Sequence, residues 1–205
     1  PTGSMKDRMA LAMVEAAEGD GRLKPGGSVV EYTGGSTGVS LAFVCAAKGI
    51  SLQIVTSEAF SKEKRDRMRA LGARLTLVPS PTGGTTKPLT HEMIETARRL
   101  AAAPGCYWTD QLNNTDQLAS YERMGEEIWE EAGGRITAFV QSVGTAGSLA
   151  GISTRLREHD ASVRIVAVEP EESAVLSGRP SGSHKIEGTG AGFVVPLWHD
   201  TLEAQ

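Results

Sequence analysis

Cysteine is scarce in this sequence, with only Cys45 and Cys106 among 205 residues. Two cysteines do not make the disulfide framework of a small secreted protein, and a low number is typical of chains kept in a reducing compartment. Cys45 lies inside the apolar run from Val39 to Ala47, where a buried thiol within a helix is expected. The cysteine content therefore favours a cytoplasmic protein.

Long apolar runs and an excess of basic charge are missing as well. The run from Val39 to Ala47 is much shorter than the roughly 18 residues that a transmembrane helix needs. The formal net charge is -4, and the charge run at residues 62–71 mixes both signs, as on a solvated helix face. We therefore expect no membrane span and no nucleic-acid partner.

Familiar metal and nucleotide motifs are also absent. The histidines are scattered without metal-ligand spacing, so no metal is expected; they are His91, His159, His184 and His199. The chain lacks G-x-x-x-x-G-K-[ST], and neither of its Gly-rich loops completes G-x-G-x-x-G with a ribose-binding acid downstream. A nucleotide-binding α/β module is thus an alternative without a supporting motif, and it would require equilibrium binding of a dinucleotide.

Glycine, by contrast, is abundant, at 24 of 205 residues, against about 7% in average proteins. Many glycines follow directly after apolar, β-branched runs, which indicates turns that cradle a ligand. Strands are expected at residues 28–32, 52–56, 75–78, 107–110, 137–143 and 164–168, and helices at 4–18, 39–49, 62–71, 90–103, 116–131 and 148–157. This alternation predicts an α/β fold with mostly parallel sheets flanked by helices, in two lobes of residues 1–110 and 111–205.

Two loops of similar composition stand between a strand and a helix. The first runs from Thr33 to Gly38 (TGGSTG) and the second from Gly144 to Ser148 (GTAGS). Successive backbone N–H groups and the positive end of a helix make such a turn an anion site, although a turn that merely caps a helix has the same composition. Taken alone, each loop is a weak signal.

Lys6 lies in the string PTGSMKDR, beside a turn at the expected start of a helix. Ser4-x-x-Asp7 resembles a capping box, which predicts that the helix begins here. Most lysines are simply solvated surface residues. A helix start, however, disfavours an ammonium group, and an amine whose neutral form is favoured is a better nucleophile for Schiff-base formation.

The string PTGSMKDR resembles the lysine motif of the cysteine synthase and cystathionine β-synthase family, whose members are pyridoxal-phosphate (PLP) enzymes of fold type II. Further strings resemble the family in the same order, namely EYTGGSTG, NNTDQLASYERMGEEIWEE, GTAGSLAG, VEPEESAVLSG and HKIEGTGAGF. Together they cover nearly the whole chain. The family has further residues on both sides of this stretch, so the resemblance implies a fragment of a two-lobed enzyme.

The resemblance implies roles for individual positions. Lys6 matches the lysine that binds PLP covalently and then moves a proton at the substrate α-carbon. The loop that binds the PLP phosphate is matched by Gly144, Thr145, Ala146, Gly147 and Ser148. The loop that receives the amino-acid carboxylate is matched by Thr33, Gly34, Ser36 and Thr37. Gln111 matches a glutamine that also contacts this carboxylate, and Gly188 falls beside the cofactor ring.

The loops also depart from the family pattern. Where the family has TSGNTG, Ser36 replaces the Asn that bonds the 3′-oxygen of the cofactor, and Gly34 replaces a Ser that donates to the carboxylate. In the phosphate loop, GTGGT has become GTAGS, in which Ser148 keeps the hydroxyl group. These changes are compatible with PLP and bear mainly on the choice of substrate.

The resemblance implies a cysteine synthase-like enzyme that catalyses β-replacement on an activated serine, such as O-acetylserine, with sulfide or a thiol. It also implies a homodimer that acts on a small-molecule amino acid. Within the same chemistry, a cystathionine β-synthase-like enzyme and a serine/threonine dehydratase remain alternatives. A catalytically idle paralogue that binds PLP without turnover is the alternative from another class.

Overall fold

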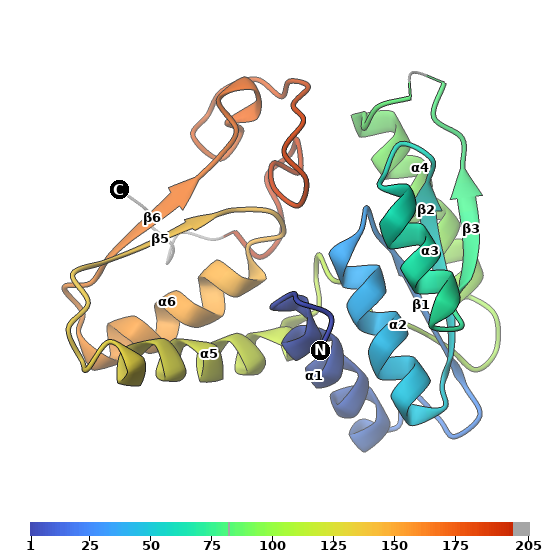
Figure 1. Cartoon of the computed structure of the whole chain (residues 1–205), viewed down its shortest axis with the longest axis horizontal. Coiled ribbons are helices and arrows are strands. Elements are labelled where there is room, and N and C mark those ends of the chain that lie inside the picture. The colour runs from blue at the N-terminus through green and yellow to red at the C-terminus, as the bar shows by residue number, and fades with distance from the viewer. Residues whose placement is uncertain (82, 199–205) are drawn as a thin grey trace. The chain divides into compact units, whose positions relative to one another are not determined.

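A computed structural model describes residues 1–81 and 83–198, and these fall into two compact units that divide between Gln111 and Leu112 (Figure 1). The division falls next to the boundary expected near Asp110. The first unit contains α1 (Lys6–Asp20), β1 (Ser28–Tyr32), α2 (Ser36–Lys48), β2 (Ser51–Ser57), α3 (Lys62–Ala70), β3 (Arg74–Val78), α4 (Lys87–Ala101) and β4 (Cys106–Trp108). Among the described residues, no helix is both long and apolar enough to cross a membrane.

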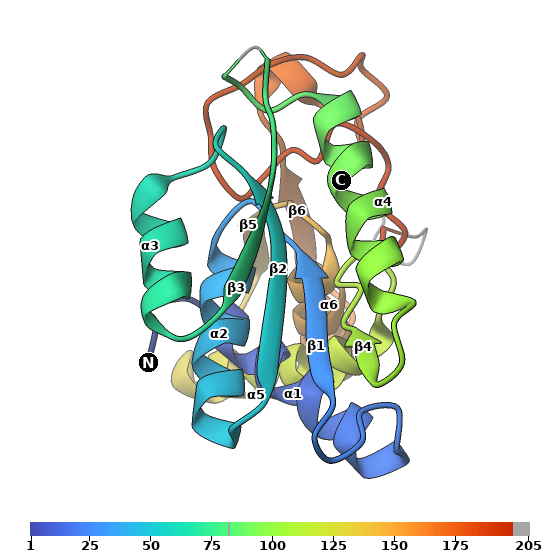
Figure 2. The ribbon, with the colours of Figure 1, turned by 90° about the vertical axis from the view of Figure 1, so that its right-hand side faces the viewer.

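The sheet of the first unit has the strand order β3-β2-β1-β4, and all of its neighbours are parallel. Helices α2 and α3 lie on one side of this sheet and α4 on the other (Figure 2). Parallel strands joined through helices are the arrangement that the alternating pattern predicts. The predicted α/β fold with parallel strands and flanking helices is confirmed.

Side chains of β1 alternate between two hydrophobic clusters. Val29 packs with residues of α1, α2 and α3, including Val14, Leu41 and Met68. Val30, the next residue, belongs to the cluster that contains Met93 of α4. Successive residues of a strand point to opposite faces, so the central strand carries a core on each side. The sheet is therefore a rigid support for the loops at its carboxyl edge.

The second unit contains η1 (Thr115–Gln117), α5 (Leu118–Glu131), β5 (Ala138–Ser142), α6 (Gly147–His159), β6 (Arg164–Val168) and η2 (Glu171–Ser173). Strands β5 and β6 pair in parallel. Helices α5 and α6 cross closely, since a Cβ on Gly151 would lie 2.6 Å from Cβ of Tyr121. Residues 174–198 contain neither helix nor strand.

The expected elements are confirmed, with differences of a few residues at their ends. Helix α4 begins at Lys87 rather than residue 90, because the Thr86 hydroxyl accepts a hydrogen bond from the amide of Leu89 and Pro88 suits a first turn. The helix expected over residues 116–131 is divided into the short η1 and the longer α5.

Candidate active site

Lys6 is the first residue of α1, and its side chain is half-buried. Burial disfavours a charged ammonium group and lowers the pKa of Lys6 well below its ordinary value, to about 8. A larger share of the side chain is therefore neutral near neutral pH than for a solvated lysine. A neutral amine in this position can attack a carbonyl carbon and can accept a proton.

The turn before α1 is held differently from the predicted capping box. Ser4 Oγ accepts a hydrogen bond from the Lys6 amide at 3.2 Å. The Asp7 carboxylate, however, accepts from the Thr2 amide at 2.8 Å and from the Thr2 hydroxyl at 2.6 Å. The capping-box prediction is therefore wrong, because the Ser4 hydroxyl accepts from the Lys6 amide rather than the Asp7 amide and because Thr2 presents two donors to the Asp7 carboxylate.

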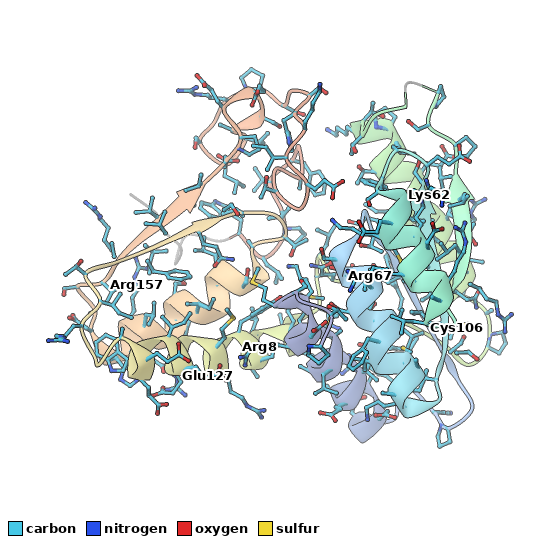
Figure 3. All side chains as sticks on the ribbon, viewed as in Figure 1. Arg8, Lys62, Arg67, Cys106, Glu127 and Arg157 are labelled. Atoms are coloured by element: carbon cyan, nitrogen blue, oxygen red, sulfur yellow. The ribbon has the colours of Figure 1, made fainter. Side chains whose placement is uncertain are left out.

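Thr2 also ties this turn to the rest of the first unit. Its carbonyl oxygen accepts a hydrogen bond of 3.3 Å from Arg67 of α3 (labelled in Figure 3). Its hydroxyl lies 3.5 Å from the hydroxyl of Ser40 in α2. The segment before Lys6 is thus fixed through Thr2 against two helices that follow the expected carboxylate loop.

The expected carboxylate loop follows β1 and leads into α2. Thr33 is buried, its amide donates to the Val55 carbonyl at 2.9 Å, and its hydroxyl oxygen accepts from the Gly35 amide at 3.0 Å. Gly35 is the N-cap of α2 and has no side chain that could accept from the amides of the first turn. A helix that starts in this way suits an anionic group such as a carboxylate.

Packing explains why residue 34 is a glycine, which the sequence alone did not indicate. A Cβ at this position would lie 2.6 Å from a carbon of the Phe60 ring. Phe60 therefore occupies the space that the family's serine side chain needs. Gly35 is crowded in the same way by Lys64 of α3, whose Cδ would lie 2.7 Å from a Cβ there. The loop follows these neighbouring side chains closely.

Thr37 and Gln111, which are far apart in the sequence, meet beside this loop. The Thr37 hydroxyl donates to Gln111 Oε1 at 2.7 Å, and both residues are buried. The structure thus brings together two residues that the sequence assigns to the same carboxylate. The sequence did not indicate a role for Glu31. Its fully buried carboxylate accepts a hydrogen bond of 2.9 Å from the backbone N–H of Gln111.

The expected phosphate loop joins β5 to α6 in the second unit. Ala146 is the N-cap of α6 and has a φ of 65°, which is the left-handed region that favours glycine. Its methyl group cannot accept a hydrogen bond from the helix start. Gly147 and Ser148, which open α6, are buried. An uncapped, buried helix start of this kind suits an anion such as a phosphate.

Two further contacts shape this loop. A Cβ on Gly144 would overlap the carbonyl oxygen of Gly188, so the phosphate loop and the segment expected beside the cofactor ring lie against each other. The Gly190 amide also donates to the Val143 carbonyl at 2.9 Å. Gln141 Nε2 donates to the Ser148 hydroxyl oxygen, which leaves the Ser148 proton to be given to another acceptor.

Comparison with known proteins decides the family. The chain matches the family described as "Pyridoxal-phosphate dependent enzyme" over residues 1–203. The chain belongs to this family. A cysteine synthase of Staphylococcus aureus (strain N315) is 41% identical over 196 residues, which are 95% of this chain and 61% of that relative. The chain thus spans less than two thirds of the length of the curated relatives it matches.

Solved structures agree with this assignment. O-acetyl serine sulfhydrylase isoform 3 from Entamoeba histolytica matches with a TM-score of 0.89 and 36% identity, over 98% of this chain and 59% of that one. An O-acetylserine dependent cystathionine β-synthase from Helicobacter pylori matches with a TM-score of 0.90 and 33% identity, over the whole of this chain and 65% of that one. The predicted family and fold type II are confirmed, and the family is PLP-dependent.

The residues present fit this cofactor. PLP carries a phosphate, and the second unit offers a buried helix start that has glycine at the positions where a Cβ would collide with neighbouring atoms. PLP also carries an aldehyde, and Lys6 in the first unit is an amine with a lowered pKa. Within residues 1–81 and 83–198, no group of three or more His, Cys, Asp and Glu side chains could hold a metal ion; His199 lies outside these residues.

Proposed function

We propose that the full-length protein is a cysteine synthase-like enzyme, which replaces the β-substituent of an activated serine, such as O-acetylserine, with sulfide or a thiol. The observation that carries this proposal is the Lys6 amine, whose pKa burial lowers to about 8 at the start of α1. The name of the Staphylococcus aureus relative, cysteine synthase, supports the same activity.

Individual residues have proposed roles toward the cofactor. Lys6 would bind PLP covalently, and the buried start of α6 would receive its phosphate through Gly144, Thr145, Ala146, Gly147 and Ser148. Ser36 would meet the 3′-oxygen with a hydroxyl in place of the longer amide, and Gly188 would be placed beside the ring. When bound, PLP supplies an electron sink for charge that develops at the α-carbon of an amino acid.

Binding and proton transfer are the work of this chain's own side chains. The start of α2 takes the α-carboxylate, with Thr33, Gly34, Ser36, Thr37 and Gln111 around it. Lys6, once its amine is released and neutral, removes the proton from the α-carbon. A pKa of about 8 suits this step, because the neutral amine is then a substantial fraction near neutral pH.

Assembly and location belong to the same proposal. A homodimer and a cytoplasmic location are typical of enzymes with this activity. Cys45 and Cys106 are both free thiols, and burial raises the pKa of Cys45 to about 12, so this thiol stays protonated and inert. Two free thiols agree with a reducing compartment.

A cystathionine β-synthase-like activity is the second candidate. It is supported by the similarity to the Helicobacter pylori enzyme, and by Gly34 and Ser36, which change the loop that faces the substrate. The two candidates share the amino-acid donor and differ in the nucleophile, since one uses sulfide and the other uses homocysteine.

The test uses the full-length holoprotein with O-acetyl-L-serine and either sulfide or homocysteine. We expect cysteine to form with sulfide, and formation to be abolished in Lys6→Ala but retained in Lys24→Ala, an exposed lysine in a turn. Formation of cystathionine in place of cysteine would favour the second candidate. Turnover that survives Lys6→Ala would overturn both candidates.

A further inference from the structure

Glu31 is a carboxylate in the interior of the first unit. It is the fourth residue of β1, a strand with an apolar core on each face, and its side chain is 0% exposed. Burial raises the pKa of Glu31 to about 7, against four hydrogen bonds that oppose the rise. Burying a carboxyl group is unfavourable, so its contacts should explain why it is retained here.

Each oxygen of this carboxylate accepts two hydrogen bonds. Oε2 accepts from the Thr109 hydroxyl at 2.7 Å and from the backbone N–H of Gln111 at 2.9 Å. Oε1 accepts from the Tyr32 amide at 2.8 Å and from Trp108 Nε1 at 3.4 Å. Three of the four donors belong to the last residue of β4 and the segment that follows it, so Glu31 binds this part of the chain to β1.

The segment has a strained residue at its centre. Asp110 has a φ of 44°, in the left-handed region that a non-glycine residue rarely adopts. Its two neighbours, Thr109 and Gln111, are the residues that donate to Glu31 Oε2. The Thr109 amide also donates to the Val30 carbonyl at 3.1 Å, and this carbonyl, 3.3 Å from the Thr109 hydroxyl oxygen, shares the hydroxyl proton with Glu31. The contacts on both sides hold the unfavourable conformation of Asp110 in place.

This turn decides where the Gln111 side chain lies. Gln111 Oε1 accepts a hydrogen bond from the Thr37 hydroxyl in the first turn of α2. Because the side-chain oxygen of Gln111 is turned toward Thr37, the side-chain NH₂ group points away from Thr37. This NH₂ group is a hydrogen-bond donor. An N–H donor fixed beside a helix start is the group that an amino-acid carboxylate binds.

We propose that Glu31 is a positioning residue for substrate binding. Its carboxylate fixes the turn at Asp110 and so presents the side-chain amide of Gln111 to the α-carboxylate of the amino acid. The role rests on the proposed function. It is geometric rather than attractive, because a carboxylate repels an anionic substrate. The four donors around Glu31 offset that charge, and Gln111 makes the contact.

Glu31→Gln keeps the size of the side chain but cannot accept all four hydrogen bonds. An amide has one acceptor oxygen and one NH₂ group, so one pair of the four donors must face an NH₂. Whichever way the amide turns, at least one buried N–H, of Tyr32, Trp108 or Gln111, loses its acceptor. We expect kcat/KM for O-acetyl-L-serine to fall about tenfold or more, as when one hydrogen bond to a charged group is lost, with most of the change in KM.

A double-variant cycle separates positioning from a general structural role. If Glu31 acts through Gln111, Glu31→Gln adds little in a Gln111→Ala background. Thr109→Val, which removes one donor and keeps the shape, is expected to give part of the loss, and Thr109→Ser to restore the wild-type KM. Glu92→Gln changes an exposed glutamate of α4 and serves as the matched control. Full additivity of Glu31→Gln and Gln111→Ala would overturn the proposal.

The closing experiment needs no turnover. Hydrogen exchange of the segment around Asp110 and the affinity for L-alanine, read from the absorbance of bound PLP, are measured on the full-length holoprotein. L-alanine carries the α-carboxylate but no β-leaving group. Faster exchange and weaker L-alanine binding in Glu31→Gln and Thr109→Val are expected; unchanged exchange and affinity overturn the role of Glu31. If these changes occur in a protein that forms neither cysteine nor cystathionine, the proposed function fails, but the positioning role of Glu31 is supported.

Discussion

The hydroxyl of Thr37 and the side-chain oxygen of Gln111 are joined by a buried hydrogen bond of 2.7 Å, although one residue lies in the first turn of α2 and the other follows β4. Parallel strands bring the two together, since β1 and β4 are neighbours in the sheet and the loops after them leave from the same edge. This pairing gives the proposed carboxylate site its two side chains from distant parts of the sequence.

Removing the Thr37 hydroxyl is expected to weaken substrate binding. Thr37→Val keeps the shape of the side chain but leaves Gln111 Oε1 without this donor, so the amide can turn. We expect KM for O-acetyl-L-serine to rise about tenfold with a smaller change in kcat, the cost of one buried hydrogen bond. Thr37→Ser is the control that keeps the donor; steady-state kinetics showing equal KM for Val and Ser would contradict the assignment.

Gly144→Ala is expected to impair PLP binding. The added Cβ would overlap the Gly188 carbonyl oxygen, so the phosphate loop and the segment at Gly188 would have to separate. We expect the dissociation constant of PLP, measured by absorbance or fluorescence titration, to rise about tenfold or more, as for a core clash of 1–3 kcal/mol. Gly19→Ala, at a helical position with no heavy atom near the new Cβ, should leave it unchanged; equal effects would refute the loop contact.

Gln141 is expected to tune the phosphate site through Ser148. Its amide donates to the Ser148 hydroxyl oxygen, which fixes the rotamer and aims the hydroxyl proton at another acceptor. Gln141→Leu removes this donor at similar volume, and we expect PLP to bind about fivefold more weakly, within the usual value of one hydrogen bond. A Ser148→Ala background should abolish the effect, and a persistent loss there would show that Gln141 acts elsewhere.

The pH dependence of stability should reveal Glu31. Burial raises its folded pKa to about 7, above the unfolded value of about 4.3, so the folded chain binds more protons between these values. Its contribution to stability is therefore present at low pH and is lost as the pH rises toward 7. Relative to Glu31→Gln, the wild-type unfolding free energy should decrease by up to about 1.4 kcal/mol per pH unit in this window.

The groups that face Glu31 do not reverse this slope. Tyr32 keeps its proton throughout, because burial, Glu31 and Asp110 all raise the pKa of its hydroxyl. The Asp110 carboxylate is present in both wild type and Glu31→Gln, so it cancels in the comparison. Urea unfolding of both proteins across the window checks the sign, and a wild-type stability that rises with pH relative to the variant would contradict it.

Much of the fold could be predicted from the sequence, because its strands are short apolar runs bounded by glycine-rich turns. The strand at residues 28–32 is an example, since SVVEY agrees with β1 at both ends. The pairing of strands into the order β3-β2-β1-β4 could not be read in this way, because register depends on contacts between distant segments.

The two loops of the candidate site could be recognised from the sequence as glycine-rich turns, whereas the contacts between distant side chains could not. Glycine-rich turns at helix starts marked both loops. Nothing in SVVEY shows that Glu31 is buried, because its partners Thr109 and Gln111 lie far along the chain. The same reason explains Gly34, where the Phe60 ring excludes a side chain, and Asp7, whose carboxylate binds Thr2 instead of completing a capping box.

The central claim is that Lys6 holds the cofactor. The most direct test is to add PLP to the full-length protein, reduce it with borohydride, digest it and find the modified lysine by mass spectrometry. We predict a pyridoxyl group on the peptide that contains Lys6, and its loss in Lys6→Ala. A pyridoxyl group on another lysine, or on none, would contradict the account.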